Sequence, residues 1–365
     1  MSSKVGISGT NFVVNGQPFI FRGCNIEFEG LNIHYYGLPL PTLTQSTFDL
    51  LKSWKVNLLR ISMHMEATSI GYNVWQEAFW TNLQTLLDLA EANGIYLLIT
   101  PIMDYNMAPK FGGSGMPNWI FATASTQDQG WDVLYKAIVN KDPVYSQVEE
   151  AFRYYYQRIA TMCKGRNIVM GFDIFNEPEY RNVAGYSRES ATIFYEALAA
   201  YLTAIDNTKP IAVENNFIST RKPNIPNLFS SPHTYITANP GDSVSTIISR
   251  LVGYNGIGSS NTWQVPVISG EWWAPDIGAT FTEAQSVAWT KDCVTAFAQL
   301  KWGSTVLRRG TQISGSNPGL STSAAIQQTY LDYFALNTSL PPLPTGIPPV
   351  LALLGLVWLF LSTRK

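Results

Sequence analysis

The chain has 365 residues, of which 46% are hydrophobic and only 14% are charged, and its formal net charge is −2. This composition can bury a large core, and the weak negative charge without basic clusters argues against nucleic acid as a partner. Three cysteines form an odd, sparse set, which excludes a disulfide framework, offers no metal site and predicts buried free thiols.

The N-terminal half predicts strands that alternate with helices. Asn15-Gly16 between two apolar runs predicts a β-hairpin. The expected elements then follow in chain order as a strand over 19–25, a helix over 47–54, a strand over 56–62, a helix over 75–93 and a strand over 95–101. Residues 102–146 interrupt this alternation as a long glycine- and aromatic-containing loop.

The alternation resumes after the long loop. The sequence predicts helices over 148–163, 188–206, 282–300 and 322–336, and strands over 168–175, 211–213, near 233, near 269 and near 305–307. Alternating strands and helices without a second composition regime indicate one α/β domain with a parallel sheet.

A carboxylate ends the strand predicted at 168–175. Its last residues lead into Asn176-Glu177-Pro178, where proline has no N–H for a strand ladder and biases Glu177 toward an extended backbone. The carboxyl end of a parallel strand is where a (β/α)8 barrel holds its chemistry. Glu177 is therefore a candidate catalytic residue, with an ordinary solvated glutamate as the alternative.

A second carboxylate, Glu271, ends the β-rich run that begins at Val265, and Trp272 and Trp273 follow it. Two carboxylates on different strands can cleave a glycosidic bond, since one donates a proton while the other stays ionised. Sugar rings stack on indole, so Trp272 is a predicted substrate contact. Core packing is the alternative for at least one of the two tryptophans, because neighbouring strand residues face opposite ways.

Over roughly residues 5 to 337 the chain resembles glycoside hydrolase family 5, the cellulase-like retaining β-glycosidases of clan A. The resemblance depends on five segments in order, namely Phe21-Arg22-Gly23-Cys24-Asn25, Asn57-Leu58-Leu59-Arg60-Ile61-Ser62, Asn176-Glu177-Pro178, His233-Thr234-Tyr235 and Gly270-Glu271. It implies an α/β fold, a (β/α)8 TIM barrel with an N-terminal β-hairpin, as one glycoside hydrolase catalytic domain over residues 1–337.

The resemblance also implies catalytic roles. Glu177 would be the general acid/base and Glu271 the nucleophile, with carboxyl groups about 5–5.5 Å apart, a spacing that gives retention of configuration. Arg60 would keep the nucleophile ionised through its opposite charge.

Three further residues would support this pair. Asn176 would hydrogen-bond the sugar 2-OH, Tyr235 would hydrogen-bond the nucleophile, and His233 would lie near the acid/base. No cofactor is implied.

Two positions depart from the family pattern. The usual histidine after strand three is absent, and Tyr105 would fill its space; the usual tryptophan of strand eight is replaced by the segment 307–310. The long loop would form one wall of the substrate cleft, with Trp119 and Trp131 as candidate sugar platforms or as simple loop packing.

An open cleft with many aromatic residues favours endo-acting hydrolysis of a β-1,4-linked polysaccharide, of the cellulose or β-glucan type. An endo-β-1,4-mannanase and a glycolipid-cleaving member of the family are the alternatives. A catalytically silent surface carbohydrate-binding protein is the alternative from another class. We expect a monomer.

The C-terminal residues differ from the rest in composition. Residues 338–349 form a proline-rich linker, and the apolar run within 350–365, closed by Arg364 and Lys365, predicts a membrane anchor. A tail docked on the barrel and a removable sorting signal are the alternatives. No signal peptide is seen at the N-terminus, yet the low charged fraction and the tail favour an extracellular or cell-surface protein.

Overall fold

The computed structural model describes residues 4–28, 33–35, 38–40, 44–103, 107–178, 183–214, 217–253, 263–275, 277, 280–306 and 323–336. The predictions for Tyr105, for the segment 307–310, and for the linker and anchor beyond residue 337 lie outside these residues. No helix within the described ranges is long and apolar enough to cross a membrane.

The N-terminal hairpin is part of a small antiparallel sheet of β1 (Val5–Ser8), β2 (Asn11–Val14) and β3 (Gln17–Phe19). Asn15 and Gly16 both have positive φ, 54° and 73°, as a two-residue hairpin turn requires. The ring of Phe12 lies 5.4 Å from that of Phe21, directly before the first barrel strand. The sheet therefore packs against the amino ends of the barrel strands.

Eight parallel strands form the barrel. In chain order they are β4 (Arg22–Phe28), β7 (Leu58–Met63), β10 (Tyr96–Thr100), β11 (Val169–Asp173), β12 (Ile211–Val213), β13 (Leu228–Ser230), β14 (Ile268–Trp272) and β15 (Gly303–Val306). Seven of the eight pairs of neighbouring strands are joined by hydrogen-bonded ladders. The eighth pair, β13 and β14, is joined by two isolated parallel bridges, from Ser230 to Val267 and from His233 to Glu271. The predicted TIM barrel is confirmed.

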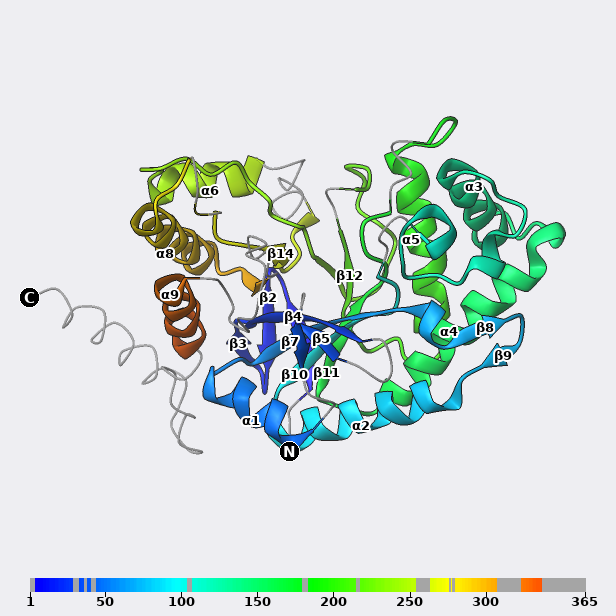
Figure 1. The fold of residues 1–365 in the computed structure, drawn as a ribbon, viewed down its shortest axis with the longest axis horizontal. Coiled ribbons are helices and arrows are strands. Elements are labelled where there is room, and N and C mark those ends of the chain that lie inside the picture. The colour runs from blue at the N-terminus through cyan, green and yellow to red at the C-terminus, as the bar shows by residue number, and fades with distance from the viewer. Residues whose placement is uncertain are drawn as a thin grey trace, which may run out of the picture.

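Helices surround these strands (Figure 1). They are α1 (Gln45–Ser53), α2 (Glu77–Asn93), α3 (Gln127–Ile138), α4 (Ser146–Cys163), α5 (Arg188–Thr203), α6 (Val244–Gly253), α8 (Glu283–Leu300) and α9 (Ala324–Ala335). Local signals set their ends: Gly94 closes α2 in the left-handed conformation with φ of 68°, and Ser187 and Thr282 open α5 and α8 with capping boxes.

The sequence reading missed several elements. The strand predicted over 19–25 is divided, because Phe19 ends β3 and β4 begins at Arg22. Residues 102–146 contain α3 and the 3-10 turns η2 (Pro109–Phe111), η3 (Asn118–Phe121) and η4 (Pro143–Tyr145) rather than a plain loop. Other unpredicted elements are α6, the 3-10 turn η1 (Met65–Ala67), and the strands β5 (Ile33–Tyr35), β6 (Leu38–Leu40), β8 (Ser69–Gly71) and β9 (Val74–Trp75).

The three cysteines are free and buried, as predicted. Burial raises the pKa of the Cys24 thiol to about 12, so it stays protonated and is a poor nucleophile. Cys24 packs in the hydrophobic core of the barrel.

Candidate active site

The polar residues of the barrel mouth come from the carboxyl ends of different strands. Arg60 lies within β7 and Glu271 within β14, while Glu177, Glu214 and His233 follow β11, β12 and β13. Because parallel strands end at the same rim of a barrel, these side chains meet although they are far apart in the sequence.

Arg60 is the centre of the network and is fully buried. Its Nε donates to Asp173 Oδ2 at 2.8 Å. Nη1 donates to Glu271 Oε1 at 2.9 Å and to Asn25 Oδ1 at 3.1 Å. Nη2 donates to Asn176 Oδ1 at 3.0 Å and to Glu214 Oε1 at 3.1 Å.

These contacts use all five N–H donors of the guanidinium. Burial acts to lower the pKa of Arg60, but the carboxylates of Asp173, Glu271 and Glu214 raise it above the ordinary value. Arg60 is therefore a permanent positive charge against the predicted nucleophile and is not a surface ion pair.

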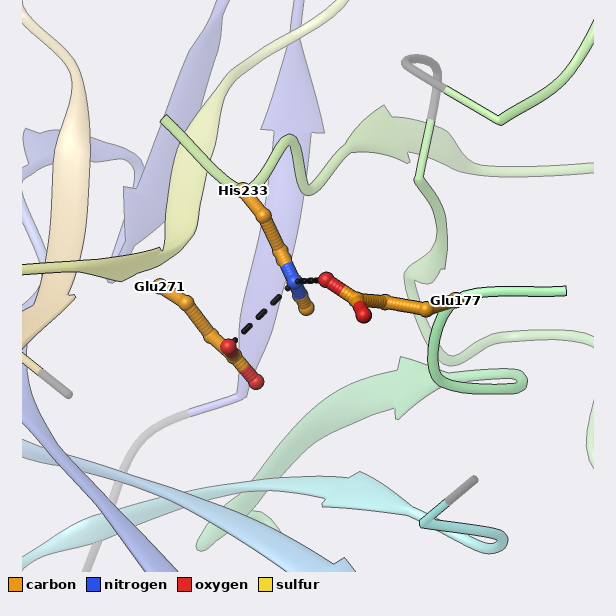
Figure 2. A group of neighbouring side chains, drawn as sticks. All are labelled: Glu177, His233 and Glu271. Atoms are coloured by element: carbon orange, nitrogen blue, oxygen red, sulfur yellow. Dashed lines mark hydrogen bonds and ion pairs between the residues drawn. The ribbon is translucent and has the colours of Figure 1, made fainter. Parts of the chain in front are cut away.

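His233 lies between the two candidate glutamates (Figure 2). Its Nδ1 is 2.6 Å from Glu177 Oε1 and 3.3 Å from Glu271 Oε2. One ligand atom from each of the three side chains lies within 4.8 Å of the others. The structure thus brings Glu177, Glu271 and His233 together, as the sequence predicted.

Among the described residues, these three side chains also have the spacing that could hold a metal ion. Arg60 already places a positive charge 2.9 Å from Glu271, which opposes a cation at this position. The donor set fits proton transfer between carboxyl groups better than metal binding.

Tyr235 donates its hydroxyl hydrogen to Glu271 Oε2, so its predicted contact with the nucleophile is present. The ring of Trp273 packs against that of Tyr235, with centroids 4.1 Å apart. Trp273 and Tyr235 are both half-buried, whereas Glu271 is buried. The structure therefore places Trp273, which the sequence reading did not select, against Tyr235, whose hydroxyl binds Glu271.

Trp272 corrects one prediction. It is 1% exposed and packs edge-on against Phe297, Tyr330 and Tyr333 of the outer helices. Successive strand residues point to opposite faces, so when Glu271 points into the mouth, Trp272 points outward into the core. Trp272 is not a substrate contact.

Trp131 is a second correction. It lies in α3, is 1% exposed and packs against Phe175 and Phe194, so it is a core residue and not a sugar platform. Trp119 is half-buried; its Nε1 donates to Ser69 Oγ at 3.1 Å and its ring contacts Tyr72. The role proposed for Trp119 stays a prediction.

The backbone of Glu177 also differs from expectation. Its φ is +48°, in the left-handed region, rather than extended. Such a conformation costs a non-glycine residue about 1–3 kcal/mol and persists only where neighbours hold it. Glu214 Oε2 provides that support, because it accepts the N–H of Glu177 at 2.8 Å.

Glu214 is the main site residue that the sequence reading missed. It follows the apolar strand β12 and is fully buried. Burial acts to raise the pKa of Glu214, and the positive charges of His233 and Arg60 act to lower it. A carboxylate at the end of an apolar strand is the signal that singled out Glu177 and Glu271, and it could have found Glu214 as well.

The buried pair of Glu214 and His233 predicts how stability depends on pH. Burial acts to lower the pKa of His233, but the carboxylates of Glu214, Glu271 and Glu177 raise it well above 6.5. A raised value means that the folded protein holds a proton that the unfolded chain releases, so this stability is present at low pH and lost as the pH rises.

We therefore expect the free energy of unfolding to fall as the pH rises above about 6.5, by up to about 1.4 kcal/mol per pH unit. Urea unfolding at four pH values measures this slope, and Glu214→Gln should flatten it. Glu91→Gln, which changes an exposed helical carboxylate, is the control and should keep the slope. A stability that rises across this range would contradict the assignment.

Comparison with known proteins agrees with this geometry. The family model described as Cellulase (glycosyl hydrolase family 5) matches residues 15–305. No curated protein matches the chain by sequence.

Solved structures show the same fold at low identity. A crystal structure of an endogalactoceramidase has a TM-score of 0.69 at 15% identity, covering 91% of this chain and 84% of that one. A β-glucanase from Saccharophagus degradans in complex with cellotetraose has 0.62 at 18%, covering 92% and 94%. An endo-1,4-β-mannanase from Rhizomucor miehei has 0.63 at 16%, covering 93% and 100%.

Proposed function

Because the chain belongs to glycosyl hydrolase family 5 and is thus a glycoside hydrolase, we propose that it is a retaining endo-β-glycosidase that cleaves β-1,4-linked glucan. The observation that supports retention is the short spacing of its glutamates. Oxygen atoms of Glu177 and Glu271 lie within 4.8 Å of each other around His233. Inverting pairs hold their carboxyl groups about 6.5–9.5 Å apart to admit a water molecule, and retaining pairs hold them about 5–5.5 Å apart. The close approach of one oxygen from each glutamate therefore favours direct attack.

In the first step Glu271 attacks the anomeric carbon while Glu177 gives a proton to the leaving oxygen. In the second step Glu177 takes a proton from water, and the water oxygen displaces Glu271 from the anomeric carbon. Arg60 places its positive charge against Glu271 through the 2.9 Å contact of Nη1 with Oε1. Tyr235 orients the second carboxylate oxygen.

Asn176 is suited to the predicted contact with the sugar 2-OH. Arg60 holds its side-chain oxygen at 3.0 Å, so the sugar contact would use the amide N–H atoms of the side chain. Trp273 takes the place that the sequence reading gave to Trp272, as a half-buried aromatic surface next to Tyr235.

The two tryptophans form a matched pair of substitutions. Trp272→Ala should lower the free energy of unfolding by about 3–5 kcal/mol, because it removes a buried indole from the core. Trp273→Ala should leave stability nearly unchanged and raise KM for the sugar substrate. Urea unfolding and steady-state kinetics on both variants test this contrast. Equal stability losses would contradict the assignment of the two side chains.

The substrate is tested by release of reducing ends from carboxymethyl cellulose and mannan, and by release of free sugar from a glycosylceramide. We expect glucan to be hydrolysed fastest, and proton NMR should show the β-anomer as the first product. Faster cleavage of mannan or glycolipid would replace glucan as the substrate and keep the mechanism. An α-anomer as first product would overturn retention. Binding of glycans without hydrolysis would favour the carbohydrate-binding alternative.

A further inference from the structure

Glu214 is a buried carboxylate that neither catalytic step uses directly. It lies one residue beyond β12 and none of its side chain is exposed to solvent. Desolvating an ionisable group is costly, so a buried glutamate needs partners that hold it. Its partners identify a second task at the same site, and the inference drawn from them rests on the function proposed above.

Three N–H groups surround the two oxygens of Glu214. Oε1 lies 3.1 Å from Arg60 Nη2 and 3.0 Å from His233 Nε2. Oε2 accepts the backbone N–H of Glu177 at 2.8 Å. Arg60 and the backbone can only donate, and a carboxylate accepts from all three groups when His233 carries hydrogen on Nε2.

The two nitrogens of His233 face different carboxyl groups. Nε2 faces Glu214, while Nδ1 faces Glu177 Oε1 at 2.6 Å and Glu271 Oε2 at 3.3 Å. Which nitrogen holds hydrogen is set by the partner of the other one. When Nε2–H is held by Glu214, Nδ1 and Glu177 share one proton across their short contact.

We propose that Glu214 is a positioning residue: its buried carboxylate keeps hydrogen on His233 Nε2 and makes Nδ1 the atom that shares a proton with the acid/base Glu177. In the protonated state the shared hydrogen lies between Nδ1 and Glu177 Oε1. After Glu177 has given its proton to the leaving oxygen, its carboxylate faces the Nδ1 lone pair, which makes it a stronger base toward water. The negative charge of Glu214 also raises the proton affinity of the pair formed by His233 Nδ1 and Glu177.

The other charges around Glu214 and His233 do not replace this effect. Arg60 from β7 acts in the opposite sense, as a positive charge, while Asp173 from β11 bonds Arg60 Nε at 2.8 Å. Glu271 from β14 contacts Nδ1, not Nε2. From α5, Tyr195 is neutral, because burial raises the pKa of its hydroxyl well above 10, and it donates to a backbone carbonyl. Among the residues that the structure describes, Glu214 is thus the carboxylate that faces Nε2 of His233.

Nitrogen NMR of the full chain tests the hydrogen position directly. The sequence contains only His34, His64 and His233, so ¹⁵N-histidine labelling with a His233→Asn spectrum assigns the signals. We expect His233 Nε2 of the wild-type protein to carry hydrogen from pH 5.5 to pH 8. As the pH is raised, Nε2 of Glu214→Gln should lose this hydrogen at a lower pH than Nε2 of the wild-type protein. A wild-type Nε2 without hydrogen, or identical Nε2 behaviour in both proteins, would overturn the proposal.

The pH profile of activity tests the consequence for Glu177. Glu214→Gln removes the negative charge, so the alkaline limb of the pH profile of kcat/KM should shift to lower pH by about one unit. Glu214→Asp keeps the charge and should keep the limb, at a lower kcat. Asp173→Asn is the matched control, because it removes a buried carboxylate from Arg60 without touching His233, and its limb should stay in place. A limb unmoved in Glu214→Gln would contradict the proposal.

A substrate with a good leaving group separates chemistry from folding. On 2,4-dinitrophenyl β-cellobioside, whose leaving group needs little protonation, Glu214→Gln should keep most of the wild-type kcat/KM, which reports the first step. On an unactivated glucan at pH 7, kcat/KM should fall about tenfold, as one pKa unit predicts. Equal losses on both substrates would indicate a structural role only. If the wild-type protein cleaves no glycoside, the proposed function fails, while the NMR experiment still decides the hydrogen position.

Discussion

Replacing Glu271 by alanine should lower kcat/KM on every β-glycoside by on the order of 10⁴- to 10⁶-fold, the effect of removing a covalent nucleophile. The carboxylate is held on both sides, by Arg60 Nη1 at 2.9 Å on Oε1 and by the Tyr235 hydroxyl on Oε2. These contacts hold the carboxylate in place beside the positive charge of Arg60. Steady-state kinetics on glucan and on an aryl β-cellobioside measure the loss.

Two observations distinguish a nucleophile from a residue that only supports the site. A 2-fluoro glycoside with a good leaving group should leave a stable glycosyl ester on Glu271, which mass spectrometry of the peptide can locate. Azide should restore part of the activity of Glu271→Ala and give the α-glycosyl azide, since it attacks from the nucleophile's face. A label on Glu214 or Glu177 instead would contradict the assignment. Glu91→Gln again serves as the exposed control.

Replacing Glu177 by alanine should lower the rate on unactivated glucan by about 10²- to 10⁴-fold, the usual contribution of general acid/base catalysis. The rate of the first step on a dinitrophenyl glycoside should change much less, because its leaving group needs no proton. The second step still lacks its base, so the glycosyl-enzyme should accumulate and a burst should appear. Stopped-flow kinetics on both substrates measure this difference.

Azide provides the matching chemical test. It needs no deprotonation, so it should accelerate the second step of Glu177→Ala and give the β-glycosyl azide. The opposite product configurations in Glu177→Ala and Glu271→Ala would assign the two roles. Equal losses of first-step rate on both substrates in Glu177→Ala, without azide rescue, would mean that Glu177 is not the proton donor.

Local sequence patterns predicted most of the barrel. Turn chemistry at Asn15-Gly16, a left-handed stop at Gly94 and apolar runs for the strands are properties of neighbouring residues, and each was confirmed. Helix α3 was missed because glycines and aromatic residues around it predicted a loop, while its cap at Thr126 and its packing on Phe175 favour a helix.

The candidate site was predictable only in part, and Trp272 and Trp273 show why. Both follow Glu271, and the sequence cannot tell which one shares its face until the direction of Glu271 is known. The structure sets that direction through Arg60, Tyr235 and the bridge to His233, so Trp273 faces the mouth. Likewise, the left-handed backbone of Glu177 depends on an acceptor from another strand, Glu214.

The sequence by itself determined that the chain folds as a barrel with carboxylates at the ends of its strands, because strand length, apolar runs and turn residues are local properties. It also brought Arg60, His233 and Tyr235 into the expected site through family resemblance. Only the tertiary structure decided that five donors of one buried arginine on β7 join four other strands, that Trp273 replaces Trp272, and that Glu214 lies against His233. These contacts link residues that are distant along the chain, so their geometry exists only after the barrel closes.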